Sequence, residues 1–166
     1  MAFDKHKGLF PTAGHDHKTC VSSALEGAER YCREHGLRLT TLRRQVLELV
    51  WTSHRPVGAY ALLEQISSEG RKAAPPTVYR SLDFLMEHGL IHRIASLNAY
   101  VGCSHLTHNH APRFFICDQC GEAAELDDPA IDDAIARDAE KLGFRIERQT
   151  LEISGICAQC ENGAIA

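Results

Sequence analysis

Residues 75–102 read PPTVYRSLDFLMEHGLIHRIASLNAYVG, and this stretch decides the fold of the N-terminal half of the chain. Its two prolines are typical of the first turn of a helix. Gly89, in the left-handed conformation, would end that helix. Apolar residues recur along one face of that helix at Val78, Leu82 and Leu85. Residues 90–94 and 98–102 then predict two strands joined by a short turn. A helix followed by a hairpin is typical of a winged helix-turn-helix domain, and a generic helical subdomain is the alternative that periodicity leaves open.

Three further helical patterns precede this segment. The first begins at Thr19, the second has Thr40 as its N-cap, and the third covers residues 59–66. Cys20 and Cys32 lie on the first helix, where twelve positions turn them about 120° apart. Because they cannot bind the same metal ion, we expect both to be thiols that pack between helices.

Composition excludes several classes of protein. The 166 residues are 44% hydrophobic and 24% charged, and no run approaches the roughly 20 apolar residues of a membrane-spanning helix. The first residues have no apolar stretch that resembles a secretory signal. The seven cysteines are therefore expected in a reducing cytoplasm, where metal binding is commoner than disulfide formation.

The formal charge is unevenly distributed along the chain. Residues 1–18, 19–102 and 103–166 contribute +1, +2 and −7 to the net charge of −4. Because the acidity lies in the last third, the first two-thirds could still face a polyanion such as DNA.

The last third predicts a second, smaller unit. After a histidine-rich loop over residues 103–112, the pattern predicts strands over 113–117 and 122–126, a helix over 129–142 and a strand over 144–154. A unit of about 50 residues buries too little surface for a stable core, so it needs a metal, a disulfide or a partner chain.

Two Cys-x-x-Cys pairs supply the strongest chemical signal. Cys117 and Cys120 form the first pair and Cys157 and Cys160 the second, with 36 residues between them. Two such pairs complete a closed tetrahedral zinc site, which would join the two ends of the small unit. A thioredoxin-like redox pair needs only one such motif, and unrelated core cysteines are the other alternative.

A second set of candidate ligands spans the junction between the two units: His92, Cys103, His110 and Glu125. One thiolate, one carboxylate and two neutral imidazoles sum to −2, and a thiolate among nitrogen and oxygen ligands favours zinc over iron(II) or manganese(II). Taken singly, these residues also fit a surface histidine, a buried thiol and an acid at a strand edge. His105 and His108 are spare candidates, although solvated loop histidines are commoner.

The helix that begins at Pro75 also carries candidate DNA contacts. Thr77 lies where helix N-terminal amides can hold a phosphate, and Tyr79 and Arg80 would project from the first turns. Arginine reads guanine through a bidentate contact in the major groove. An exposed arginine on an ordinary helix is the alternative.

Six motifs resemble the ferric uptake regulator family, and within it the zinc uptake regulator branch, in order over about residues 20–160. They are Arg38-Leu-Thr-x-x-Arg43, Pro75-Pro-Thr-Val-Tyr-Arg80, Ser81-Leu-Asp-Phe-Leu-Met-Glu-His-Gly-Leu90, Asn98-Ala-Tyr-Val-Gly-Cys103, Phe115-Ile-Cys-Asp-Gln-Cys-Gly121 and Gly155-Ile-Cys-Ala-Gln-Cys160. The iron-sensing branch has a His-His-Asp-His linker. Thr107-His-Asn-His110 departs from that pattern, which favours zinc sensing.

The resemblance implies an α+β fold and a homodimeric, zinc-sensing transcriptional repressor. The expected domains are a mobile tail (1–18), a winged-helix DNA-binding domain (19–102), a hinge (103–111), a zinc-stapled α/β dimerisation domain (112–160) and a final tail (161–166). The repressor would bind pseudo-palindromic operators in double-stranded DNA when zinc fills the hinge site, and would control zinc uptake genes.

Two Zn²⁺ ions per protomer are implied. Cys117, Cys120, Cys157 and Cys160 would hold a structural zinc, and His92, Cys103, His110 and Glu125 a regulatory one. Tyr60 and Arg80 match base-contacting positions of the family, and Thr77 and Tyr79 fall in its recognition helix.

Three rival functions follow from the same residues. An iron(II) or manganese(II) sensor is the rival within the class, and Cys103 argues against it. A zinc hydrolase or deaminase would need an open coordination position and a His-x-Glu motif, which the sequence lacks, so we expect neither an enzyme nor a small-molecule substrate. A dimerisation module that binds protein is the third.

Overall fold

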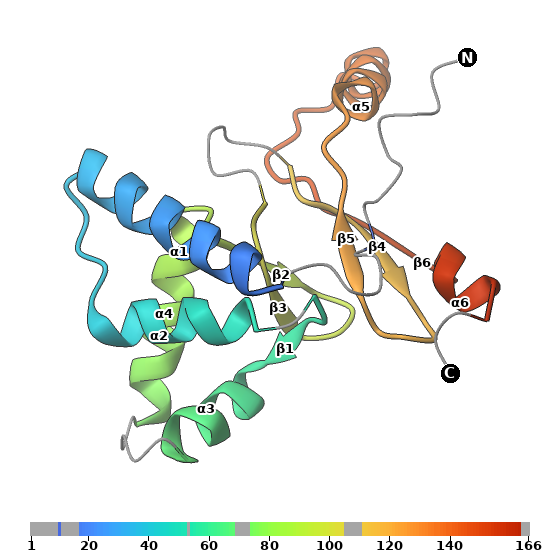
Figure 1. Ribbon diagram of the computed structural model, residues 1–166. Coiled ribbons are helices and arrows are strands. Elements are labelled where there is room, and N and C mark those ends of the chain that lie inside the picture. The colour runs from blue at the N-terminus through green and yellow to red at the C-terminus, as the bar shows by residue number, and fades with distance from the viewer. Residues whose placement is uncertain (1–9, 11–16, 53, 69–73, 105–110, 164–166) are drawn as a thin grey trace.

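The computed structural model describes residues 10, 17–52, 54–68, 74–104 and 111–163. Figure 1 shows helices gathered around a small sheet in the N-terminal part and a second sheet in the C-terminal part, so the fold is α+β as predicted. Within the described residues, no helix is long and apolar enough to cross a membrane.

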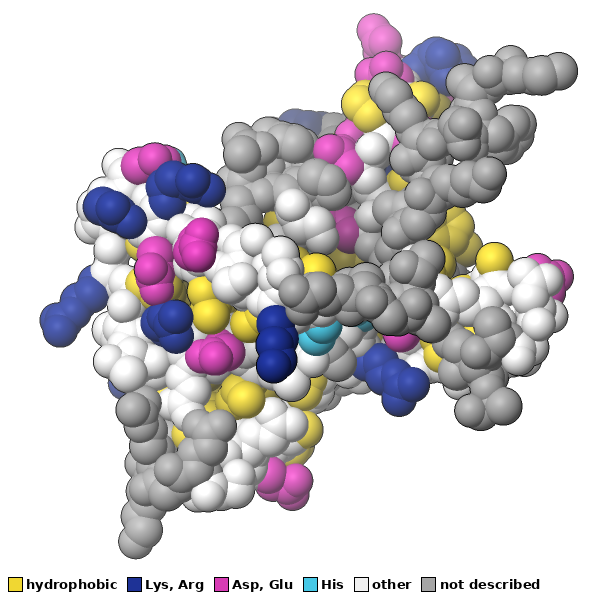
Figure 2. Space-filling model, in the orientation of Figure 1, with side chains coloured by type: hydrophobic (Ala, Val, Ile, Leu, Met, Phe, Trp, Pro, Cys, Tyr) yellow, Lys and Arg dark blue, Asp and Glu magenta, His cyan; other side chains and the backbone are white. Residues whose placement is uncertain are grey.

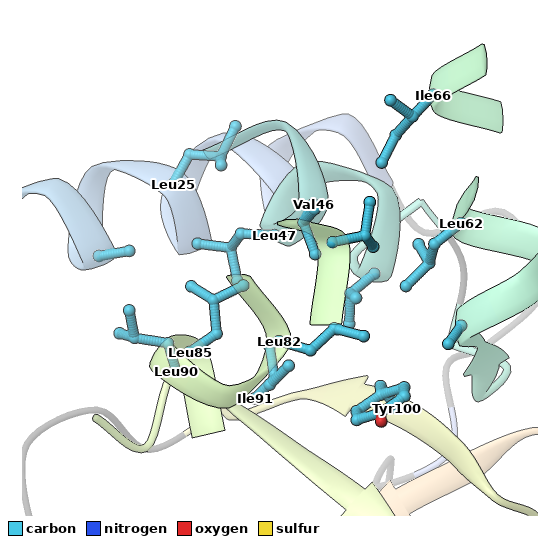
Figure 3. Close-up of a cluster of buried hydrophobic side chains, with 14 of the residues drawn as sticks. Leu25, Val46, Leu47, Leu62, Ile66, Leu82, Leu85, Leu90, Ile91 and Tyr100 are labelled. Atoms are coloured by element: carbon cyan, nitrogen blue, oxygen red, sulfur yellow. The ribbon is translucent and has the colours of Figure 1, made fainter. Parts of the chain in front are cut away.

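Four helices form the N-terminal part: α1 (His17–Glu34), α2 (Thr41–Val50), α3 (Ala59–Ser68) and α4 (Pro75–Glu87). Each directs an apolar face into one cluster, which Figure 3 shows with Leu25, Leu47, Leu62 and Leu82 from the four helices pointing inward. The helical periodicity of the sequence therefore predicted both the helices and the side chains that they bury.

Local signals end and begin these helices as expected. Thr40 Oγ1 accepts a hydrogen bond from Arg43 N–H at 3.3 Å, which confirms Thr40 as the N-cap of α2. Gly89 has φ +64°, and the N–H of Leu90 bonds the carbonyl of Leu85 at 2.8 Å, as at a left-handed helix end.

A three-stranded antiparallel sheet, ordered β1-β3-β2, packs against the helices. The predicted hairpin is β2 (Ile91–Ile94) and β3 (Ala99–Gly102), whereas β1 (Val57–Gly58) is too short to leave a pattern in the sequence. Gly102 has a specific reason to be glycine, because a Cβ there would lie 2.1 Å from the Trp51 ring. The chain can therefore approach Trp51 closely just before it reaches Cys103.

The C-terminal sheet is ordered β5-β4-β6, from β4 (Arg113–Cys117), β5 (Ala123–Glu125) and β6 (Leu151–Gly155). Strand β4 pairs antiparallel with β5 and parallel with β6, and α5 (Pro129–Lys141) lies in the connection between β5 and β6. A single turn of helix, α6 (Ala158–Glu161), follows β6 and was not predicted.

One strand prediction is wrong over most of its length. The predicted strand over 144–154 is a strand only in β6, and residues 144–150 are irregular. Phe144 and Ile146 alternate with charged residues as in a half-buried strand, yet they are 66% and 37% exposed. Residues 144–150 have no pairing partner among the described strands of this single chain.

The two parts of the chain contact each other directly. Ile94 of β2 packs with Phe114, Ile116 and Ala123 of the C-terminal sheet. The Glu152 carboxylate on β6 accepts the backbone N–H groups of the β2–β3 turn, from Ala95 at 2.7 Å and from Ser96 at 3.1 Å. Apolar packing and the Glu152 carboxylate thus both help to hold the hairpin against the second sheet.

Glu152→Gln is expected to lower the free energy of unfolding at neutral pH by about 1 kcal/mol, because a charged acceptor is replaced by a neutral one. The Ser96 hydroxyl, with the Ala95 and Ser96 N–H groups, lowers the pKa of Glu152 against an opposing effect of burial. Because the pKa of Glu152 is lower in the folded than in the unfolded protein, the ionised carboxylate stabilises the fold fully above the unfolded pKa of about 4.3. This stabilisation is lost as the pH falls through the pKa of the folded protein. Urea titrations from neutral to acid pH should therefore show the two proteins converging below about pH 4. Glu64→Gln, at an exposed position of α3, should match the wild type throughout.

Candidate metal centres and nucleic-acid face

The four cysteines of the two Cys-x-x-Cys pairs lie together at one end of the C-terminal sheet. Cys117 ends β4, Cys120 lies in the following turn, and Cys157 and Cys160 flank and occupy α6. The Sγ atoms of Cys117 and Cys160 are 3.7 Å apart, and those of Cys120 and Cys157 are 3.9 Å apart. Tetrahedral zinc with Zn–S bonds of about 2.3 Å needs sulfurs about 3.8 Å apart. All four are free thiols, so the donor set fits a closed Cys₄ zinc site.

Backbone groups prepare one of these sulfurs to be a thiolate. The N–H groups of Cys120 and Cys157 point at the Cys117 sulfur and lower the pKa of that thiol to about 6. Burial raises the pKa of Cys120, and burial together with the neighbouring thiols raises the pKa of Cys160 to about 12. Four sulfurs packed this closely cannot all ionise without a cation to balance their charge.

A second group joins the wing to the C-terminal sheet. His92 of β2, Cys103 after β3 and Glu125 of β5 have ligand atoms within 4.8 Å of one another. Cys103 is 2% exposed and the Glu125 residue 7% exposed, so the group lies inside the junction between the two parts. The antiparallel hairpin brings the start of β2 beside the end of β3, which is why His92 and Cys103 meet.

Polar contacts hold the Glu125 carboxylate in this group. One oxygen lies 3.2 Å from His92 Nε2, and the other accepts the backbone N–H of Ser104 at 3.0 Å. One imidazole, one thiolate and one carboxylate converge, and this donor set is one that zinc binds. The fourth predicted ligand, His110, lies outside the described residues, as do His105 and His108. The role of these residues as ligands stays a prediction.

The predicted DNA contacts lie on two helix starts. Tyr60, in the first turn of α3, is 79% exposed, and Tyr79, near the start of α4, is 39% exposed. Thr77 and Arg80 are also exposed on α4, while Val78 between them is buried. These four side chains are therefore accessible to a ligand without any rearrangement of the core.

The start of α4 differs in one respect from the expected phosphate site. Pro75 and Pro76 have no N–H, and the N–H groups of Thr77 and Val78 both point to the Ala74 carbonyl, at 2.9 and 3.4 Å. Thr77 consequently offers its hydroxyl to a phosphate more readily than its backbone amide.

A third group was missed by reasoning from the sequence. His17, Cys20 and His54 have ligand atoms within 4.8 Å of one another. The sequence predicts His17 in the tail and Cys20 in helix packing, but α1 begins at His17 and both residues lie beside His54. Cys32, by contrast, is buried in the N-terminal core as predicted. The His-x-x-Cys spacing at the helix start was the available signal.

Residues 34–154 match the model of the ferric uptake regulator family. The chain belongs to this family. Membership of a family of regulators confirms the expectation that the chain is not an enzyme.

Relatives and solved structures agree with this family assignment. The zinc uptake regulation protein of Escherichia coli (strain K12) is 39% identical over 145 residues, which are 86% of this chain and 84% of that protein. A structure of a zinc uptake regulator complexed with zinc and DNA superposes with a TM-score of 0.80 at 37% identity, covering 87% of this chain and 98% of that one.

The two solved states of XcZur, 44% identical to this chain, match it unequally. Holo XcZur superposes with a TM-score of 0.78, covering 84% of this chain and 98% of that one. Apo XcZur reaches only 0.50, covering 85% and 97%. The arrangement described here thus resembles the holo state of that family member more closely than its apo state.

Proposed function

We propose that the chain is a cytoplasmic, zinc-responsive transcriptional repressor that binds pseudo-palindromic operators as a homodimer and controls zinc uptake genes. The observation that carries this proposal is the convergence of His92, Cys103 and Glu125 from the wing and the C-terminal sheet. A ligand set divided between two parts of a chain can couple metal binding to their relative arrangement.

The regulatory site consists of His92, Cys103, Glu125 and, we propose, His110 from the linker. Zinc bound there would cross-link the wing to β5 and neutralise a ligand set of charge −2. Glu125 is already oriented by His92 and by the Ser104 N–H, which hold its carboxylate at the other described ligands. The four cysteines form the separate structural zinc site, which gives two zinc ions per protomer.

Relatives support the same mechanism. The zinc and DNA complex of a zinc uptake regulator and the holo state of XcZur both resemble this chain in overall arrangement. We infer that the arrangement described here is the one that binds DNA, and that metal-free chains depart from it. Only a preference of zinc for this arrangement can drive such a switch.

We propose three parts: residues 19–102 bind DNA, residues 103–111 form the hinge, and residues 112–160 form the dimerisation domain. We propose that α4 is the recognition helix, with Arg80 and Tyr60 contacting bases and with Thr77 and Tyr79 beside them on the DNA face. All four are exposed on the starts of α3 and α4.

A homodimer is supported by surface that a single chain leaves uncovered. Helix α5 has no buried residue, and Leu142 and Phe144 are 81% and 66% exposed. A groove of about 450 Å³ runs between α5 and residues 142–150, lined by Ile135, Leu142, Phe144 and Ile146 among others. The strand-like pattern of residues 144–150 fits pairing with a second copy, which would also bury these apolar side chains.

The function is tested by measuring DNA binding against buffered free zinc, using fluorescence anisotropy on operator fragments selected from genomic DNA. We expect affinity to rise at very low free zinc and not with iron(II) or manganese(II) at comparable levels. Binding that needs iron(II) or manganese(II) would assign the chain to another metal. Binding that ignores every metal would leave a DNA-binding protein without a regulatory site.

Arg80→Ala is expected to weaken operator binding by roughly 1–3 kcal/mol and to relax base preference at one position of each half-site. The guanidinium is exposed near the start of α4, where it can reach a base edge. Binding to a panel of operators with single base changes measures both effects. Arg33→Ala, exposed at the far end of α1, is the control and should leave base preference unchanged. Equal weakening on every sequence would make Arg80 a phosphate contact.

A further inference from the structure

Three metal-binding side chains meet at a place that the proposed zinc sites do not use. His17 and Cys20 lie three positions apart in the first turn of α1, so they share one face of the helix. His54 reaches the same place from the turn between α2 and β1. Residues from two segments more than thirty positions apart in sequence thus converge on one point.

The geometry is close to that of a bound ion. The three ligand atoms lie within 4.8 Å of one another, and the rings of His17 and His54 have centroids 4.6 Å apart with planes tilted by 56°. Tetrahedral zinc needs nitrogens about 3.3 Å apart and a nitrogen–sulfur separation of about 3.6 Å. The observed separations exceed these values by little more than 1 Å, a difference of the size that side-chain rotations cover.

The donor chemistry of the group also fits a metal. Two imidazoles and one thiolate are the donors that zinc prefers, and three protein ligands leave a fourth position for water. All three residues are half-buried, and both ring nitrogens of His17 are buried. Figure 2 shows a small patch of histidine surface near the middle of this view, beside a lysine or arginine side chain.

We propose that His17, Cys20 and His54 form a third metal site, selective for zinc and similar thiophilic divalent cations. The site would tie the start of α1 to the α2–β1 turn. The backbone carbonyl of His54 accepts the N–H of Ala123 at 3.1 Å, and Ala123 is two positions before Glu125 on β5. A metal at this site would therefore also brace the helices against the strand that carries Glu125.

The inference is tested by counting metal, which requires neither DNA nor the proposed repressor function. Wild type, Cys20→Ser, His54→Gln and His35→Gln would be dialysed as full-length chains against the same zinc buffer and analysed for bound zinc. We expect each of the first two variants to hold one zinc equivalent fewer than the wild type. His35→Gln, an exposed histidine at the other end of α1, should match the wild type.

Alkylation of Cys20, compared with and without zinc in the same protein, supplies a second readout at the thiol itself. Zinc should protect Cys20 from iodoacetamide in the wild type, because a coordinated thiolate is not free to react. In His54→Gln the cysteine is still present but should lose that protection, as peptide mass spectrometry would show. Equal zinc content in all four proteins, or zinc-independent alkylation of Cys20 in the wild type, would overturn the third site.

Discussion

Cys117→Ser is expected to unfold the C-terminal sheet together with α5, and to leave the N-terminal helices folded. The sheet buries few apolar side chains of its own, and α5 buries none. Structural zinc in small peptides contributes an apparent 10–16 kcal/mol or so of folding free energy, whereas a whole domain is stable by only about 5–15 kcal/mol. Removing one of four ligands should therefore exceed what this part can lose.

Circular dichroism and sedimentation together measure this effect. We expect loss of strand signal and of the proposed homodimer, with helix signal from α1 to α4 retained because their cluster is large and separate. Cys32→Ala is the matched control, since it removes a buried thiol from the N-terminal core and leaves the four sulfurs intact. A variant at Cys117 that stays dimeric and unfolds cooperatively like the wild type would contradict a structural role for this site.

The sequence predicted the helices and strands that are determined by signals within a short stretch of the chain. Helix α4 follows from its apolar period, its two prolines and Gly89, all within fifteen residues. Strand β4 has the predicted bounds because its apolar run is flanked by Pro112 and by the Cys-x-x-Cys turn. Each Cys-x-x-Cys pair is likewise a local motif, so the fourfold cluster could be expected from spacing and valence alone.

Elements that depend on distant neighbours could not be predicted in the same way. Residues 144–150 have a strand-like alternation, but a strand needs a pairing partner, and this chain offers them none among its described strands. The converse holds for β1, whose two residues have no pattern and exist as a strand only because β3 lies beside them. In both cases the presence of a neighbouring strand, and not the strand propensity of the residues, decides whether a strand forms.

The group of His17, Cys20 and His54 could not be predicted from the sequence for the same reason, because it depends on residues that are distant along the chain. The spacing of His17 and Cys20 is local and visible, but a pair at i and i+3 is common on helices without any metal. Only the fold places His54 against that pair, because α2 runs back along α1 before the chain turns into β1 (Figure 1). His92 and Cys103 were within reach of prediction because a single hairpin joins them.

Cys103→Ser is expected to remove zinc-dependent DNA binding while leaving the fold intact. Serine has nearly the same volume, and the Cys103 N–H that bonds the Leu90 carbonyl at 3.1 Å belongs to the backbone. The hydroxyl is a much poorer zinc ligand than a thiolate. If the DNA-competent population falls from nearly all chains to about 1%, operator affinity should fall by about 100-fold in saturating zinc.

The comparison that isolates this effect is a titration of both proteins with operator DNA, with and without zinc. The variant in zinc should match the wild type without zinc, and its thermal unfolding should be unchanged when only the structural cysteines are loaded. Glu125→Gln should behave in the same way, because the amide cannot supply the charge that completes the ligand set, and Cys32→Ala should retain the full zinc response. A Cys103→Ser protein that still binds the operator in a zinc-dependent manner would remove Cys103 from the regulatory site. The remaining His92 and Glu125 pair would then fit a harder cation than zinc, because it lacks the thiolate that selects against iron(II) and manganese(II).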